Sequence, residues 1–202
     1  MTAKHQHFKL YKPDGYISQF ITNQKRGHKK RLLGEFYNFP KEIMAIGRLD
    51  EPSEGLLLLT TDGKLSNYIN SSAIEKEYFA QVDGIISEKE IAVLKSGVKI
   101  SHRGKKYLTQ PCQAKIIAKP NLPKRQKNIR GDHHGPTSWI SITLKEGRYR
   151  QVRKMTAVVG FPTLRLVRIR IGNLSLENMQ PGEVGILENL DNIEESLNRK
   201  FI

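Results

Sequence analysis

Residues 47 to 63 read Gly47-Arg-Leu-Asp-Glu-Pro-Ser-Glu-Gly-Leu-Leu-Leu-Leu-Thr-Thr-Asp-Gly63. Glycines and a proline interrupt the first half of this segment, and such residues predict a loop. Leu56-Leu-Leu-Leu59 is a short apolar run of the kind found in buried strands. Thr61-Asp-Gly63 predicts a turn into a short helix near Leu65 to Ile69. The segment therefore places a polar loop directly before a core strand.

Asp50 is the candidate functional group of this loop. It follows Arg48 by two positions and precedes the four leucines, so a cleft could hold the carboxylate beside a local counter-ion. A turn-forming aspartate that caps backbone N–H groups shows the same local pattern. Local sequence alone favours the turn interpretation, and both interpretations stay open at this point. Glu51 and Glu54 are interpreted as solvated or structural acids.

Alternating apolar and polar residues predict strands in several further segments. These lie at 8–11, 76–82, 98–100, around Tyr107, and at 112–118, 139–144 and 164–171. A capping box of Ser87 and Glu90 predicts a helix at 88–96 that Gly97 ends. A 3.6-residue apolar spacing predicts a second helix at 150–159 and a weak one around Leu190, Ile193 and Leu197. Regular strand–helix alternation is absent, so the predicted fold class is α+β: a mixed, largely antiparallel sheet with a few flanking helices.

The composition indicates a polyanionic partner. The 202 residues contain 34 Lys and Arg against 20 Asp and Glu, a net charge of +14. Nucleic acid is the preferred partner, with a merely solvated basic surface and an acidic membrane as alternatives. No apolar run is long enough to span a bilayer and the start lacks a signal peptide's apolar core, so a cytoplasmic protein is expected.

Several classes of chemistry lose support. The sequence has no Gly-rich phosphate loop, nucleophile elbow or dinucleotide fingerprint. Cys112 is the single cysteine, which excludes an internal disulfide and a Cys-rich zinc site. The six histidines are interpreted as solvated loop residues rather than metal ligands: His5, His7, His28, His102, His133 and His134.

Four ordered motifs together resemble those of the bacterial rRNA pseudouridine synthases. The central one is the segment 47–63, and the opening one is Leu10-Tyr-Lys-Pro-Asp-Gly-Tyr16. The others are Lys76-Glu-Tyr-Phe-Ala-Gln-Val-Asp-Gly84 and the stretch from Leu144 through Lys-Glu-Gly-Arg-Tyr-Arg-Gln-Val-Arg-Lys-Met155 to Gly172. The resemblance covers residues 8–187 and implies that family's fold with a central active-site cleft.

Within the family, residues 136–139 and 158–168 look most like the large-subunit 23S rRNA synthases of the E type, which lack an N-terminal S4-like domain. The resemblance implies a single catalytic domain over residues 1–202, with two sub-lobes sharing one sheet and a disordered tail at 1–7. Three residues depart from the family pattern: Phe79, Tyr149 and Lys154. These departures concern fine substrate contacts rather than the reaction class.

The resemblance implies isomerisation of a uridine by cleavage of the N1–C1′ bond and rejoining of C5 to C1′. Asp50 would be the nucleophile, and Arg153 would form an ion pair that keeps it ionised. Tyr78 would stack on the flipped base or transfer a proton, and Leu166 would form an apolar floor. Arg48 would stabilise the flipped state. Each has a plainer alternative: a phosphate contact for Arg153, a core aromatic for Tyr78, sheet packing for Leu166 and a local salt bridge for Arg48.

Basic residues near the third motif suit a track for RNA phosphates. They are Arg148, Arg150, Lys154, Arg165, Arg168 and Arg170. Residues 119–136 are rich in proline, glycine and positive charge and predict a basic surface loop. The expected partner is 23S rRNA, with no obligatory protein partner, no membrane, a monomeric state, no organic cofactor and no metal. The alternatives are a non-catalytic rRNA-binding or ribosome-assembly protein and a same-family synthase acting on 16S rRNA or tRNA.

Overall fold

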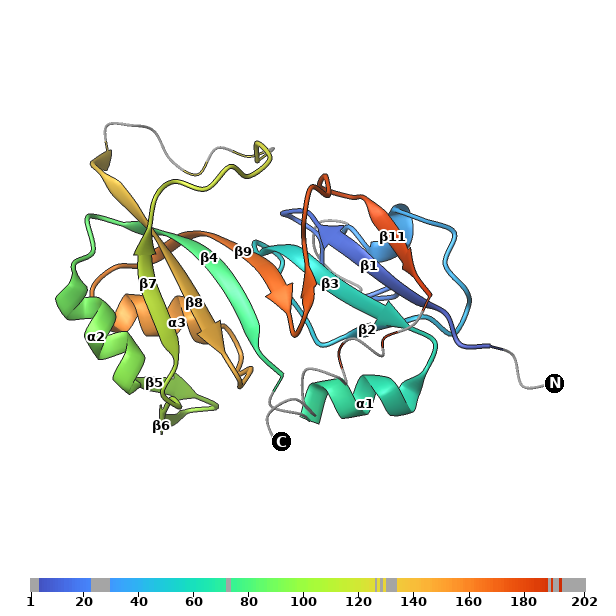
Figure 1. Cartoon of the computed structure of the whole chain (residues 1–202), viewed down its shortest axis with the longest axis horizontal. Helices are drawn as coiled ribbons and strands as arrows, with labels where there is room; N and C mark the ends of the chain where they lie inside the picture. Colours follow the sequence, from blue (N-terminus) through green and yellow to red (C-terminus); the bar gives the residue numbers. More distant parts are fainter. Residues whose placement is uncertain are drawn as a thin grey trace. The chain divides into compact units, whose positions relative to one another are not determined.

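The computed structural model of the chain describes residues 4–22, 30–71, 74–125, 127, 129, 134–188, 190 and 193 (Figure 1). The chain forms two compact units. The first comprises Met1–Ile74 and Arg170–Ile202, and the second comprises Glu75–Ile169. Strands and helices occur in both units, and antiparallel pairing prevails, in agreement with the predicted, largely antiparallel sheet.

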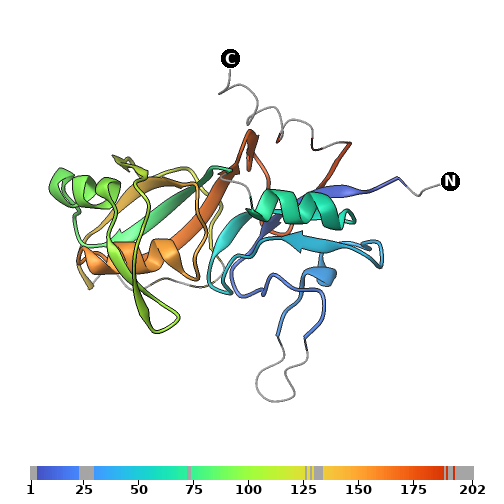
Figure 2. The same ribbon diagram turned by 90° about the horizontal axis from the view of Figure 1, so that it is seen from below.

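The first unit is built around a strand that is buried along its whole length. Its elements are β1 (His7–Lys12), the 3-10 helix η1 (Leu33–Glu35), β2 (Met44–Ile46), β3 (Glu54–Thr60), α1 (Gly63–Ser71), β10 (Leu174–Ser175) and β11 (Val184–Leu187). β1 pairs with both β11 and β3, and β2 pairs with β3. All residues of β3 are buried, which explains its unbroken leucine run. Helix α1 packs against β2 and β3 (Figure 2).

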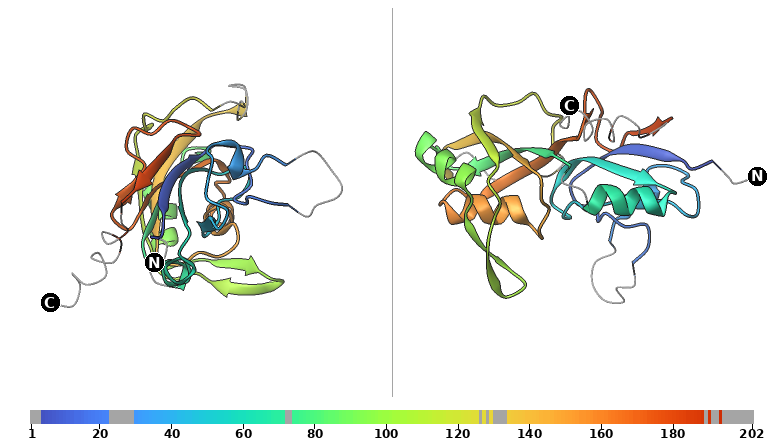
Figure 3. Two further views of the ribbon diagram at one scale, coloured as in Figure 1. Left: turned by 90° about the vertical axis from the view of Figure 1, so that its right-hand side faces the viewer. Right: turned by 60° about the horizontal axis from the view of Figure 1, so that its bottom comes forward.

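The second unit contains the remaining strands and two helices. Its elements are β4 (Lys76–Asp83), α2 (Glu88–Ser96), β5 (Lys99–His102), β6 (Lys105–Leu108), β7 (Gln113–Ile117), β8 (Thr137–Leu144), α3 (Gln151–Val158) and β9 (Thr163–Ile171), whose last two residues belong to the first unit. The strand order is β9-β4-β8-β7, while β5 and β6 form a separate two-stranded hairpin. Figure 3 shows this hairpin extending away from the other strands of its unit.

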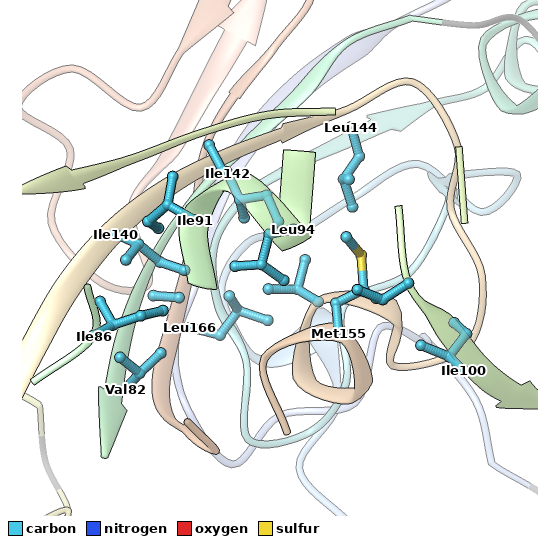
Figure 4. Close-up of a cluster of buried hydrophobic side chains, with 14 residues drawn as sticks. Val82, Ile86, Ile91, Leu94, Ile100, Ile140, Ile142, Leu144, Met155 and Leu166 are labelled. Atoms are coloured by element: carbon cyan, nitrogen blue, oxygen red, sulfur yellow. The ribbon is translucent and has the colours of Figure 1, made fainter. Parts of the chain in front are cut away.

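The core of the second unit joins its strands to both helices. Ile140 and Ile142 of β8 are fully buried, and Ile91 of α2, Met155 of α3 and Leu166 of β9 pack in the same cluster (Figure 4). The predicted cap of α2 is confirmed, because Ser87 and Glu90 form the capping box and the Gly97 N–H donates to the Leu94 carbonyl oxygen. Burial of both helices against the strands therefore follows the apolar spacing of the sequence.

The structure also corrects local predictions. β3 begins at Glu54, inside the predicted loop, and η1 and β11 were not predicted. The expected disordered tail at 1–7 does not include Gln6 and His7, because Gln6 exchanges hydrogen bonds with Thr61 and His7 belongs to β1. Residues 1–3, 23–29, 72–73 and most of the predicted C-terminal helix lie outside the described residues, as do 126, 128 and 130–133 of the basic loop.

Gly97→Ala is expected to lower the free energy of unfolding by about 2–4 kcal/mol. Gly97 has a φ of +94°, and a Cβ there would lie 2.4 Å from the Thr109 carbonyl oxygen. Urea denaturation measures the change. Gly104→Ala is the matched control, because Gly104 shares the positive φ of +75° but has no atom within 4 Å of the added Cβ. Equal losses in the two variants would show that the close contact at Thr109 is relieved by a backbone shift.

Candidate active site

The turn that carries Asp50 is fixed by backbone hydrogen bonds in the first unit. The Ser53 N–H donates to the Asp50 carbonyl oxygen over 2.9 Å, directly before β3. Leu49 is 6% exposed, and its N–H and carbonyl oxygen both bond to the Ser18 hydroxyl at 2.9 Å. Its neighbours differ in burial, since Arg48 is exposed and Asp50 is half-buried. The loop thus presents a carboxylate from a rigid support.

A buried lysine lies beneath this turn. Lys12 is 0% exposed, and its Nζ donates to the carbonyl oxygens of Pro13 at 2.8 Å, Tyr16 at 2.6 Å and Glu51 at 3.3 Å. The Gly15 N–H also donates to the Glu51 carbonyl oxygen over 2.9 Å. The ammonium group therefore joins the 13–16 turn to the turn that carries Asp50, and one side chain sets the distance between the two motifs.

Burial lowers the pKa of Lys12 from 10.5 to about 7, although the nearby carboxyl groups of Asp14, Glu54, Glu51 and Asp50 act in the opposite direction. The unfolded chain then binds more protons than the folded chain between about pH 7 and 10.5. The stabilising contribution of Lys12 is complete above pH 10.5, the pKa of the unfolded chain. It is lost as the pH falls through about 7, the pKa of the folded chain. The buried site thus couples the first unit's stability to pH.

The free energy of unfolding of the wild type, relative to Lys12→Met, is expected to rise from pH 7 towards pH 10 by at most about 1.4 kcal/mol per pH unit. Denaturation of both proteins at several pH values measures this difference. Subtracting the variant removes the contributions of other titrating groups. A difference that stays constant across the range would contradict the lowered pKa.

In the second unit, Tyr78 and Leu166 lie at the same core cluster. Tyr78 of β4 is paired with Ile142 of β8, is half-buried and packs against the cluster. Leu166 is 5% exposed and is a member of it. The position of Leu166 favours the sheet-packing interpretation, while the half-buried ring of Tyr78 fits either of its interpretations.

Arg153 lies on α3 and is held against the start of β9. Its Nη1 donates to the Thr163 carbonyl oxygen over 3.1 Å. The hydroxyl groups of Thr156 and Thr163 share a second hydrogen bond of 2.7 Å. Two contacts thus join the helix to the strand, and they restrict the direction in which the guanidinium group can reach.

The predicted phosphate contacts separate into exposed and buried groups. Arg148 is exposed, and Arg150 and Lys154 are half-buried. Arg165 and Arg168 are only 7% and 3% exposed, and the Arg165 Nη2 donates to the Pro123 carbonyl oxygen over 2.9 Å. The burial of these two arginines favours a structural role over the predicted contact with phosphate.

Comparison with known proteins identifies the family. Residues 6–158 match the family model described as RNA pseudouridylate synthase. The chain belongs to this family. It is 43% identical to ribosomal large subunit pseudouridine synthase E of Vibrio vulnificus (strain CMCP6), over 85% of this chain and 70% of that protein. It is 40% identical to the protein of the same name from Xanthomonas campestris pv. campestris, over 86% of this chain and 91% of that protein.

A solved structure supports the same assignment. The crystal structure of a pseudouridylate synthase superposes with a TM-score of 0.76 and 28% identity, covering 96% of this chain and 74% of that one. The family predicted from the four motifs and the α+β class are therefore confirmed. The protein is a pseudouridine synthase and hence an isomerase, because the reaction rearranges a nucleoside without changing its composition.

The synthase distributes the predicted catalytic residues over its two units. Asp50 and Arg48 belong to the first unit, whereas Tyr78, Arg153 and Leu166 belong to the second. The ion pair of Asp50 with Arg153 stays a prediction. Among the described residues, no group of three or more His, Cys, Asp or Glu side chains could hold a metal ion. No helix of the described segments is long and apolar enough to cross a membrane.

Two charged residues of this synthase, Lys12 and Glu54, are buried: Lys12 had no role predicted from the sequence, and the burial of Glu54 favours the structural of its two interpretations. Both are buried, at 0% and 2% exposure, whereas charged side chains are almost always at the surface unless they are paired. Their signal was present in the motifs, because Lys12 lies in the opening motif and Glu54 in the central one. Neither charged residue of the opening motif, Lys12 or Asp14, was assigned a role from the sequence.

Proposed function

We propose that this synthase converts a uridine of 23S rRNA to pseudouridine. The observation that carries the proposal is its 40–43% identity, over about 85% of the chain, to relatives named ribosomal large subunit pseudouridine synthase E. The net charge of +14 suits a polyanionic substrate. The name of these relatives indicates that the substrate RNA belongs to the large ribosomal subunit. The positive charge explains an affinity for RNA that does not depend on the RNA sequence.

We infer that Asp50 is the nucleophile of the reaction. Its turn is fixed by hydrogen bonds at Leu49 and Ser53, and a fixed carboxylate loses little entropy when it attacks an electron-poor carbon. The Arg153 guanidinium group compensates the negative charge of the Asp50 carboxylate, and the Tyr78 ring stacks on the uracil. The isomerisation changes neither oxidation state nor composition, so its chemistry requires no organic cofactor and no redox-active metal.

The uridine must leave its stack before the carboxylate can reach it, and extrusion of a base costs a few kcal/mol. The exposed side chain of Arg48 lies two residues from Asp50 and suits the space that the flipped nucleotide leaves. The Lys30 Nζ forms an ion pair with Glu51 Oε2 over 2.6 Å. Glu51 is thus already paired with Lys30. This pairing supports a role for Arg48 other than a local salt bridge to Glu51.

Pseudouridine mapping of rRNA from cells with and without the protein tests the proposal. One 23S position is expected to lose its pseudouridine in the deletion strain and to regain it when the wild-type gene is restored. A lost position in 16S rRNA or tRNA would transfer the activity to that substrate. An unchanged map of all three RNAs would leave a non-catalytic role in RNA binding or ribosome assembly.

A further inference from the structure

Two segments of the second unit carry positive charge with almost no compensation. Residues 99–108 form the β5–β6 hairpin and contain four basic residues and no acid; residues 145–154 contain five basic residues and one acid. All four hairpin cations are exposed: Lys99, Arg103, Lys105 and Lys106. A surface that only needs to be soluble mixes charges of both signs. These two segments are called the hairpin surface below.

The hairpin is fastened to the 145–154 segment. The Lys154 Nζ donates to the Ser101 carbonyl oxygen over 2.7 Å, and the Tyr107 hydroxyl donates to Glu146 Oε2 over 2.5 Å. The Arg148 guanidinium group lies 4.8 Å from the centroid of the Tyr107 ring. These contacts hold the cations of both segments in one arrangement before any ligand binds, and preorganisation lowers the entropic cost of binding.

The single acid of this surface is turned inward. The Glu146 side chain is only 9% exposed, and it accepts hydrogen bonds from Tyr107, from the Gln110 N–H at 2.9 Å and from Gln151 Nε2 at 2.6 Å. Its Oε2 also lies 3.9 Å from the Nε of the exposed Arg148, so Glu146 compensates part of one surface cation while its hydrogen bonds serve the interior contacts. The outward charge is positive, in agreement with the pKa of His102, which burial and then the charges of Arg103, Arg148 and Lys154 lower.

One aromatic ring projects from this positively charged surface. Tyr149 is 68% exposed and lies between Arg148 and Arg150 in sequence, with the Lys154 Nζ 5.2 Å from its ring centroid. Exposed aromatic rings among cations are the elements with which proteins bind unpaired nucleotides, because every base has a face that can stack. Phosphate binding alone would not need this ring.

We propose that the hairpin surface is an RNA-binding site that grips the phosphate backbone of the substrate RNA, while Tyr149 stacks on an unpaired base of that RNA. This inference rests on the proposed function for the identity of the ligand as RNA. It assigns a role to the β5–β6 hairpin and to Tyr149, which the motifs leave without one. The contribution of the hairpin to affinity depends on salt, whereas the contribution of Tyr149 depends on the strandedness of the RNA.

A triple variant tests the phosphate contacts. Lys99→Gln, Lys105→Gln and Lys106→Gln together are expected to weaken binding to transcribed 23S rRNA. They should also flatten the plot of log affinity against log salt by about 0.7–0.9 per lost contact. The matched control is Lys89→Gln, Lys95→Gln and Lys115→Gln, three exposed lysines of α2 and β7 with the same change in charge. Equal slopes for the two triple variants would overturn the proposal.

Substitution of Tyr149 tests the stacking contact. Tyr149→Ala is expected to weaken binding to a single-stranded oligouridine about fivefold or more and to leave binding to an RNA duplex of the same length unchanged. Tyr149→Phe keeps the ring and is expected to retain the wild-type affinity. Equal losses on both RNAs, or no loss for Tyr149→Ala, would overturn the stacking role.

These measurements are separate from the test of the proposed function. Wild-type protein that binds 23S rRNA but modifies none of it would contradict the proposed function. The salt dependence of binding by the two triple variants would still show whether the hairpin surface contacts RNA. The hairpin triple variant could instead keep the wild-type salt dependence of RNA binding and lose modification only on ribosomal particles. This result would show that the hairpin surface binds a ribosomal protein, and it would overturn the RNA proposal.

Discussion

Asp50→Asn is expected to lower the rate of pseudouridine formation by at least about a thousandfold and to leave most of the RNA affinity intact. The amide keeps the size of the side chain but loses its charge and its nucleophilicity. The hydrogen bonds that fix the turn come from the backbone of Leu49, Asp50 and Ser53 and from the Ser18 hydroxyl. These bonds do not involve the Asp50 carboxylate, so the substitution leaves them in place.

The matched control for this experiment is Glu51→Gln, which removes one negative charge from the next residue of the same turn. Glu51 forms its ion pair with Lys30, so this variant is expected to keep the wild-type rate within a few-fold. Single-turnover assays on 23S rRNA and binding titrations are run on both variants. An Asp50→Asn rate within tenfold of the wild type would show that another group performs the attack.

Local sequence patterns were sufficient to predict the strands that bury one face and the helix that begins with a capping box. The capping box of Ser87 and Glu90 places the start of α2, and the alternation at Tyr78, Ala80 and Val82 places β4. The Asp50 loop was also predicted correctly up to Ser53, because glycine and proline act on the backbone locally. These are the parts of the fold that a short stretch of chain specifies by itself.

The missed features depend on residues distant in the sequence. β11 is short and contains Gly185, and it forms because β1 offers a free strand edge more than 170 residues earlier. The burial of Lys12 requires three carbonyl oxygens supplied by two separate turns. Arg165 and Arg168 were predicted to contact phosphate, yet both are buried. Spacing along one strand does not reveal what covers its second face.

Arg153 is expected to matter for the chemical step rather than for the fold. Its hydrogen bond to the Thr163 carbonyl oxygen is accompanied by the bond between the Thr156 and Thr163 hydroxyl groups. Loss of the guanidinium group therefore removes the first of these hydrogen bonds between α3 and β9 and leaves the second in place. Met155 remains in the core on the buried side of the same helix, so an Arg153 variant should keep the fold of its unit.

Arg153→Met is expected to reduce the single-turnover rate at saturating RNA by about a hundredfold, the effect of removing one group that stabilises charge in an active site. Arg153→Lys keeps the positive charge and loses the planar, forked donor geometry, so an intermediate rate is expected. Thermal denaturation of both variants establishes that each is folded at the assay temperature. The measurement separates affinity from chemistry, because a residue that only contacts phosphate raises the RNA concentration needed for half-saturation and leaves the saturated rate unchanged. A wild-type rate for Arg153→Met at saturation would therefore remove Arg153 from the catalytic group and place it among the phosphate contacts.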